Sequence, residues 1–140
     1  MCRVKVKTLI ITTEVFIMEK IINLTQHTAS PEQKLAGVFD LPNHEFAKWR
    51  SLITFDSIEE WVGEKFCARM EHGIQPFLEK LYSQGWRTAM IGGAPFFMSR
   101  LEKALAENKI SALYAFTKRI VEEKDGVKRS VFKHEGFVTS

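Results

Sequence analysis

A strand, a glycine turn, a helix and a second strand follow one another within residues 86–117. "WRTAMI" is apolar enough for a buried strand, Gly92-Gly93 ends it, and a helical pattern begins near Pro95. "SALYAFTKR" has the composition of a further strand. A helix between two strands in about thirty residues forms a βαβ unit, so the two strands must be parallel. The helix is expected to bury Phe97, Leu101, Ala104 and Leu105.

The flanking segments extend this unit into a mainly parallel sheet. "KIINLT" and "GVFDLP" are short strands. Between them Ser30 caps a short helix, with Pro31 at its first position and Gln33 closing a capping box. Asp125-Gly126 is a strong hairpin signal. The expected fold is α/β, a Rossmann-like three-layer sandwich whose mainly parallel sheet of about four strands carries a C-terminal antiparallel β-hairpin.

The middle of the chain is predicted to be helical. After the helix "NHEFAKWRSLITF", Ser57 and Glu60 form a capping box that opens the longest element, and Gly85 ends it. Gly73 and Pro76 interrupt the pattern, so we expect a kink or two consecutive helices. We assign the stripe of Trp61 and Phe66 to the core rather than to a base-stacking platform. One buried face is expected to contain Ile58, Trp61, Val62, Phe66, Met70, Ile74, Phe77, Leu78 and Leu81.

The net charge of +3 is concentrated near the N-terminus. Residues 1–17 carry three basic residues and one acidic residue, and the remainder has 17 basic and 16 acidic residues. Such a neutral body argues against general DNA or RNA binding. Because Met18 precedes the first clear strand, we predict that residues 1–17 are an extension of the kind an upstream start codon produces, and that residues 18–140 are a single domain. The alternative is an edge strand, since the segment is rich in β-branched residues.

Cysteine and histidine usage argues against disulfides and metal sites. Cys2 and Cys67 do not form a disulfide framework, so a reducing, cytoplasmic compartment is expected. His44, His72 and His134 are scattered without ligand spacing, and we predict no metal and no other cofactor. No segment reaches the ~20 apolar residues of a membrane span, so no membrane association is expected.

Three polar clusters are expected at the carboxyl ends of the strands. Ligands of open α/β sheets bind at this edge, so the clusters should converge on one crevice. The glycine turn leads into a helix N-terminus, where backbone N–H groups and the helix dipole favour an anion. The clusters are Thr25-Gln26-His27-Thr28, Gly92-Gly93 and Thr117-Lys118-Arg119.

Each cluster also has a purely structural interpretation. Gly92-Gly93 fits neither the dinucleotide fingerprint nor a P-loop, and a glycine pair can serve only to close a tight turn. Lys118 and Arg119 can be a solvated strand end. His27 can act as a general base, a phosphate donor or a residue that caps the loop.

Several short motifs resemble those of small standalone proteins of the CRISPR-associated Rossmann-fold (CARF) class. They occur in the same order over residues 20–119: "LTQHTASPEQ", "DLP", Trp49, "FDSIEEW", the glycines and "LYAFTKR". The glycine segment departs from the version of that class, which has an acidic residue where this chain has Gly93.

The resemblance implies a homodimer that binds a cyclic oligoadenylate, a second messenger of type III CRISPR antiviral defence, across the dimer axis. It also implies a metal-independent ring nuclease reaction, in which a ribose 2′-hydroxyl attacks its own phosphodiester and leaves a 2′,3′-cyclic phosphate. On this reading the candidate catalytic residues are His27 and Lys118. The candidate ligand-binding residues are Thr25, Gln26, Thr28, Gly92, Gly93, Thr117 and Arg119.

Three functional hypotheses therefore stand. The first is a CARF-like binder of cyclic oligoadenylate that also cleaves it. The second is a noncatalytic ligand sensor or interaction module that uses the same crevice. The third is a small enzyme that binds a nucleotide or sugar phosphate and is unrelated to CRISPR.

Overall fold

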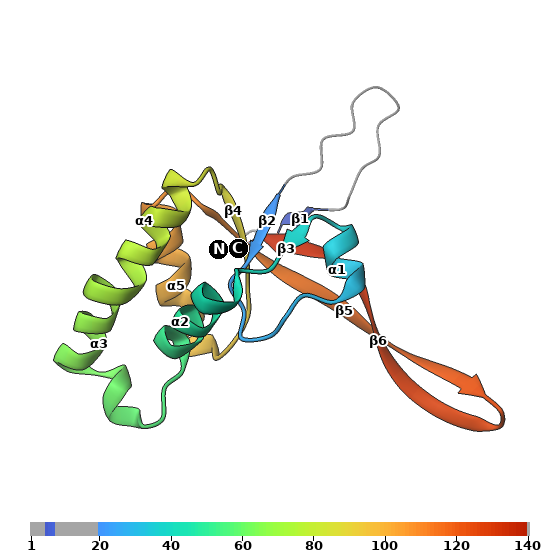
Figure 1. Cartoon of the computed structure of the whole chain (residues 1–140). Coiled ribbons are helices and arrows are strands. Elements are labelled where there is room, and N and C mark those ends of the chain that lie inside the picture. Colours follow the sequence, from blue (N-terminus) through green and yellow to red (C-terminus); the bar gives the residue numbers. More distant parts are fainter. Residues whose placement is uncertain (1–4, 8–19, 140) are drawn as a thin grey trace.

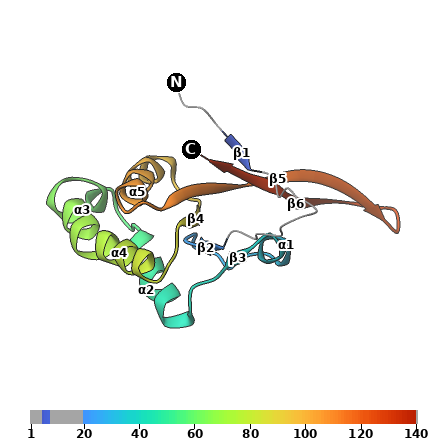
Figure 2. The same cartoon turned by 90° about the horizontal axis from the view of Figure 1, so that it is seen from above.

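The computed structural model describes residues 5–7 and 20–139 (Figure 1). Within them a long two-stranded ribbon projects away from the helices, as Figure 2 shows. The elements are β1 (Lys5–Lys7), β2 (Ile21–Asn23), α1 (Pro31–Leu35), β3 (Val38–Phe39), α2 (Asn43–Ile53), the 3₁₀ turn η1 (Ile58–Trp61), α3 (Gly63–Arg69), the π turn η2 (Met70–Ile74), α4 (Gln75–Ser83), β4 (Thr88–Ile91), α5 (Pro95–Glu107), β5 (Ser111–Lys124) and β6 (Val127–Thr139).

One sheet in the order β1-β6-β5-β4-β2-β3 organises the molecule. β3, β2, β4 and β5 are mutually parallel, whereas β6 is antiparallel to both β5 and β1. The βαβ unit predicted from the glycine turn is confirmed, since Thr88 of β4 pairs in parallel with Ser111 of β5. The hairpin at Asp125-Gly126 is also confirmed. The fold is thus the expected α/β sandwich with a C-terminal antiparallel hairpin.

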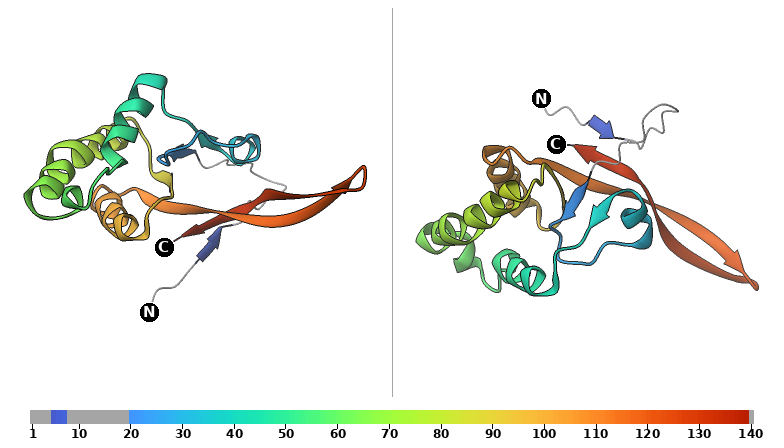
Figure 3. Two further views of the ribbon diagram at one scale, coloured as in Figure 1. Left: turned by 90° about the horizontal axis from the view of Figure 1, so that it is seen from below. Right: turned by 45° about the horizontal axis from the view of Figure 1, so that its top comes forward.

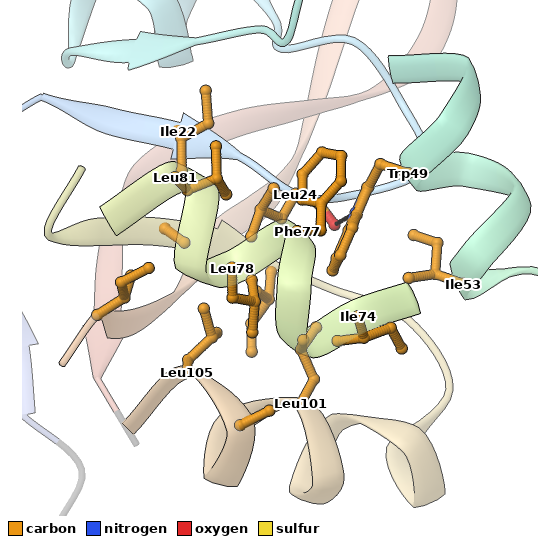
Figure 4. Packing of buried hydrophobic residues seen from close by; sticks show 14 of the residues in the cluster. Ile22, Leu24, Trp49, Ile53, Ile74, Phe77, Leu78, Leu81, Leu101 and Leu105 are labelled. Atoms are coloured by element: carbon orange, nitrogen blue, oxygen red, sulfur yellow. Dashed lines mark hydrogen bonds between the residues drawn. The ribbon is translucent and has the colours of Figure 1, made fainter. Parts of the chain in front are cut away.

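The two faces of the sheet are covered unequally. The larger core lies between the sheet and the elements from α2 to α5, and Figure 4 shows its centre. There the indole N–H of Trp49 donates to the carbonyl of Leu24 at 2.8 Å. The opposite face holds a smaller cluster that includes Ile21, Met90 and Leu113. The short helix α1 lies on this second side, so the third layer is thin.

Local sequence signals correctly predicted the start of α1 and the buried face of α5. Ser30 accepts from the Gln33 amide at 3.1 Å and the Gln33 side chain accepts from the Ser30 amide at 3.0 Å, which is the predicted capping box. All four residues expected to face inward from α5 are buried. In α2, Trp49 and Ile53 are buried.

The long helix predicted after Ser57 is divided into four pieces. The capping box between Ser57 and Glu60 exists, but it closes a single 3₁₀ turn, and Val62 then has an extended backbone. This break changes the helical phase, so the prediction that Ile58 and Val62 are buried is wrong: they are 80% and 61% exposed. The expected interruption near Gly73 and Pro76 takes the form of the π turn η2, which α4 follows directly.

Part of the predicted N-terminal extension lies within the described residues. Lys5–Lys7 form the edge strand β1, which pairs with β6 from Phe137 to Thr139. The edge-strand alternative therefore describes this short stretch. The remainder of residues 1–17 lies outside the described part of the chain.

Candidate functional site

The crevice of interest lies where the chain changes direction across the sheet. β2 and β4 are adjacent parallel strands. The loop after β2 leads to α1 on the side of the smaller cluster, whereas the turn after β4 leads to α5 on the side of the larger core (Figure 3). Such a topological switch point opens a gap at the carboxyl edge of the sheet, which is the usual ligand position in open α/β folds.

A buried asparagine shapes the loop after β2. The side chain of Asn23 is inaccessible to solvent, and its Nδ2 donates to the carbonyl of His27 at 2.7 Å and to Oδ1 of Asp40 at 2.8 Å. Its Oδ1 accepts from the amide of Thr25 at 2.9 Å. Asp40 Oδ1 also accepts from the amide of Ala29 at 2.9 Å. One amide and one carboxylate therefore hold both ends of the loop.

Sequence reasoning missed Asn23 and Asp40 as parts of the site. A polar residue inside the apolar run "IINLT" was the available signal, because buried polar side chains must find hydrogen-bond partners. The hydroxyl of Thr25 lies 2.7 Å from Asn23 Oδ1 and 2.9 Å from the His27 carbonyl. A hydroxyl has one proton and donates to only one of these at a time, so Thr25 positions the loop.

The glycine turn has a conformational requirement at its second residue. Gly93 has φ +153°, and a Cβ there would lie 3.2 Å from Cε of Met98. Gly92 differs, because a Cβ at that position would meet only Cγ2 of Thr25 at an ordinary 3.7 Å. Gly93 is thus needed for the turn itself, whereas Gly92 leaves room beside the loop after β2.

The helix that follows the turn begins without a side-chain cap. Its N-cap residue is Ala94, which offers no hydrogen-bond acceptor in its side chain, and Pro95 is the first helical residue. The Ala94 carbonyl lies 3.0 and 3.1 Å from the amide nitrogens of Phe97 and Met98. In the same domain α1 has a complete capping box, so the α5 terminus is the more open to an external anion.

The loop and the glycine turn line one crevice of about 640 Å³. Gln26, His27 and Thr28 line it from the loop, and Gly92-Gly93 line it from the turn. His27 and Thr28 are exposed, whereas Gln26 is half-buried. No lysine or arginine belongs to this described lining, so its donors are backbone amides, amide and hydroxyl side chains and an imidazole. Two of the three predicted clusters are therefore brought together.

The third cluster lies elsewhere than predicted. Thr117, Lys118 and Arg119 do not follow β5, because the strand continues to Lys124 in partnership with β6. None of the three lines the crevice. The error arises because strand length depends on a pairing partner that polar side chains do not reveal.

The two cations make weak contacts on the ribbon. Lys118 Nζ lies 3.9 Å from a carboxylate oxygen of Glu135, and Arg119 Nη2 lies 3.1 Å from Oγ of Ser130. Both side chains remain exposed. Alternation along β5 places Arg119 on the same sheet face as Ala115, which lines the crevice, and Lys118 on the opposite face.

Tyr114 also lines the crevice, and its hydroxyl donates to a carboxylate oxygen of Glu102. Burial and this carboxylate raise the pKa of Tyr114 well above its ordinary value. The phenol therefore stays protonated at neutral pH and is unsuited to act as a base.

The described residues contain no group of three or more His, Cys, Asp or Glu placed to hold a metal ion. Among the helices that the structure describes, none has the length and apolarity to cross a bilayer.

These features define an α/β protein with a crevice at the topological switch point of its sheet. A family model described as the Uncharacterized protein MJ1673 family matches residues 19–138, and the chain belongs to this family. No curated protein and no solved structure matches the chain.

Proposed function

We propose that this protein binds a cyclic oligoadenylate, or a closely related nucleotide, in the switch-point crevice. The observation that carries the proposal is the convergence of the loop after β2 and the glycine turn on one cavity, and the uncapped helix α5 begins directly after that turn. Phosphate oxygens accept hydrogen bonds from such amides. The CARF-like order of the sequence motifs supports an adenylate ring.

A ring of several nucleotides would extend from the crevice onto the ribbon. β5 continues ten residues beyond Tyr114, the last residue paired with β4, so the ribbon borders the carboxyl edge. Arg119 is on the crevice side and lies about 13 Å along the strand from Ala115. We assign the phosphate contact on the ribbon to Arg119 ahead of Lys118.

Ring cleavage is the second part of the proposal. His27 would take the proton of a ribose 2′-hydroxyl, the 2′-oxygen would bond to the adjacent phosphorus, and the bond from phosphorus to the 5′-oxygen would break. The leaving oxygen would gain a proton from water, and the product would carry a 2′,3′-cyclic phosphate.

Binding without turnover is the second candidate function. His27 is the only histidine of the described crevice lining, which contains no carboxylate side chain. A single imidazole without an acid partner also suits a ligand sensor.

A homodimer completes the proposal, because two identical half-sites match a ligand with rotational symmetry. A cytoplasmic location is part of it as well, since Cys67 is free and exposed. Sedimentation with and without ligand tests the dimer, and a monomer at micromolar concentration in both conditions would contradict it.

The binding test is a thermal-shift panel of cyclic adenylates of several ring sizes, linear adenylates and sugar phosphates. We expect stabilisation by at least one cyclic adenylate, and no shift with any cyclic adenylate would overturn the proposal. Product analysis then separates a nuclease from a sensor, with His27→Ala expected to slow cleavage more than it weakens binding.

Gly92→Ala is the cleanest variant for the crevice. The added methyl group lies beside Thr25 without a clash and should weaken binding while leaving the melting temperature unchanged. Gly93→Ala is the matched contrast, because the backbone at Gly93 disfavours any side chain and this change should lower stability as well.

A further inference from the structure

A second hollow, of about 280 Å³, lies on the other side of the glycine turn. It shares Gln26, Gly92 and Gly93 with the polar crevice. Its far wall is aromatic and includes Phe55, Trp61 and Phe96. A ligand bound at the glycine turn therefore has a polar space on one side and an aromatic space on the other.

Contacts among Phe55, Trp61 and Arg69 hold the aromatic wall in place. Phe55 stacks on Trp61 with ring centroids 3.6 Å apart and an interplanar angle of 26°. The guanidinium of Arg69 lies 4.4 Å from the Phe55 ring centre, and its Nη1 donates to the carbonyl of Thr54 at 2.6 Å. These contacts order two aromatic rings before any ligand arrives.

Phe96 is an aromatic residue that is largely exposed. It is 58% exposed in the first turn of α5, whereas the next residue, Phe97, is 2% exposed and packs in the core. The Phe96 ring meets Trp61 edge to face, with centroids 3.8 Å apart. An exposed aromatic side chain beside a polar cavity is typical of sites that stack planar ligands.

Polar groups are available at the rim of the hollow. Within the part of the chain that the structure describes, the indole N–H of Trp61 has no hydrogen-bond acceptor, and it is not fully buried. The Gln26 amide nitrogen makes a long contact of 3.3 Å with the carbonyl of Ile53. The Trp61 N–H can donate a hydrogen bond to the edge of a base. Gln26 can replace its long contact with Ile53 by a hydrogen bond to the same base.

We infer that this aromatic hollow is a nucleobase subsite that prefers a purine. The inference rests on the proposed function, because it uses the glycine turn as the phosphate position. The base stacks against Phe96, the sugar lies near Gln26, and the phosphate lies at Gly92-Gly93. The Trp61 ring is inclined at 72° to the Phe96 ring, so it meets the edge of the base. A purine is favoured because its larger ring system offers more stacking area than a pyrimidine.

The test compares AMP with ribose 5-phosphate, which lacks the base, using isothermal titration at millimolar concentrations. Phe96→Ala should weaken AMP binding roughly tenfold or more and leave ribose 5-phosphate binding unchanged. Ile58→Ala is the matched control, because Ile58 is an exposed apolar residue that does not line the hollow. Since Phe96 is largely exposed and the variant loses only its edge-to-face contact with Trp61 among the ring contacts of the described residues, the variant should melt close to the temperature of the parent.

A second readout is the tryptophan indole N–H signal of Trp61 in NMR spectra, assigned with Trp61→Phe. It should shift with AMP and stay in place with ribose 5-phosphate. Equal loss of both ligands in Phe96→Ala, unchanged AMP affinity, or no AMP binding by the parent would each overturn the inference. If Phe96→Ala alters the sedimentation coefficient but not AMP binding, the inference is also wrong, since a second copy of the chain would then cover the hollow.

Cyclic adenylates separate this inference from the proposed function. Suppose that AMP binds to the parent and binds less tightly to Phe96→Ala, but that no cyclic adenylate binds to the parent. The nucleobase subsite is then supported, and the second-messenger proposal fails. If a cyclic adenylate binds equally well to the parent and to Phe96→Ala, the subsite is wrong and the proposed function stands.

Discussion

The two halves of β5 have the same backbone conformation and different surroundings. From Ser111 to Tyr114 the strand pairs with β4, and from Leu113 onward it also pairs with β6; Leu113 is only 1% exposed. Beyond Phe116 it is paired only with β6 in the described part of the chain, and Val121 is 67% exposed. Burial stabilises the first half, whereas cross-strand contacts worth about 0.2–1 kcal/mol each stabilise the second. The first half specifies the fold, and the second is free to contact a ligand or a partner.

The largest expected effect separates the two halves directly. Leu113→Ala removes a buried side chain and should lower the free energy of unfolding by about 2–5 kcal/mol. Val121→Ala in the ribbon should change it by no more than about 0.5 kcal/mol. Urea unfolding followed by circular dichroism measures both. A comparable loss in Val121→Ala would show that the ribbon is buried in an assembly.

The ribbon should matter for binding where it does not matter for stability. Arg119→Ala should weaken cyclic adenylate binding by about 1.5–3 kcal/mol, because it removes a charge-assisted phosphate contact. Lys118→Ala is the matched control on the opposite face and should have a smaller effect. Titration calorimetry distinguishes them, and equal affinities of the parent and Arg119→Ala would exclude the ribbon from the site.

The protein should be less stable when the buried Asn23, which holds the loop after β2, is replaced. Asn23→Ala leaves the Thr25 amide without its acceptor and removes one of the donors to Asp40, so we expect a loss of about 1–3 kcal/mol in unfolding free energy. Adenylate affinity should fall with it because the loop loses its anchor. Asn43→Ala, at an exposed position, is the control. A fully stable Asn23→Ala protein would show that the loop is held by other contacts.

Removal of residues 1–17 should have a modest effect. The truncated chain loses the three-residue pairing of β1 with β6, worth about 1–2 kcal/mol at most, and keeps both core clusters. Differential scanning calorimetry checks this. A large drop in melting temperature would mean that this segment belongs to the structural core.

The smallest expected effect is a pH dependence on the ribbon side of the molecule. Burial lowers the pKa of His134, and the carboxylate of Glu32 only partly opposes this. The unfolded chain therefore binds a proton more readily, so stability should decline as pH falls below about 6.5 and level off once pH is below the folded pKa. His134→Gln should flatten this decline, while the exposed His72→Gln should not. A parallel decline in His134→Gln and the parent would assign it to other groups.

Half of the candidate site could be predicted from the sequence. The loop from Thr25 to Thr28 and the Gly92-Gly93 turn follow apolar runs, and parallel strands bring their carboxyl ends to one edge. The aromatic hollow could not be predicted, because Trp61 and Phe96 belong to elements far apart in the sequence. Exposure of Ile58 and Val62 could not be predicted either, since a single extended residue breaks the helix although the apolar residues keep their helical spacing across it.

The amino-acid sequence alone determined the βαβ unit, the capping box of Ser30 and Gln33 and the hairpin at Asp125-Gly126, because periodicity, caps and turn chemistry act over a few neighbouring residues. Only the tertiary structure decided that β5 runs on past Arg119, that Asn23 and Asp40 join to hold the loop, and that two hollows share the glycine turn. These features depend on contacts between distant segments, whose partners are chosen by packing and pairing of the whole chain rather than by local propensity.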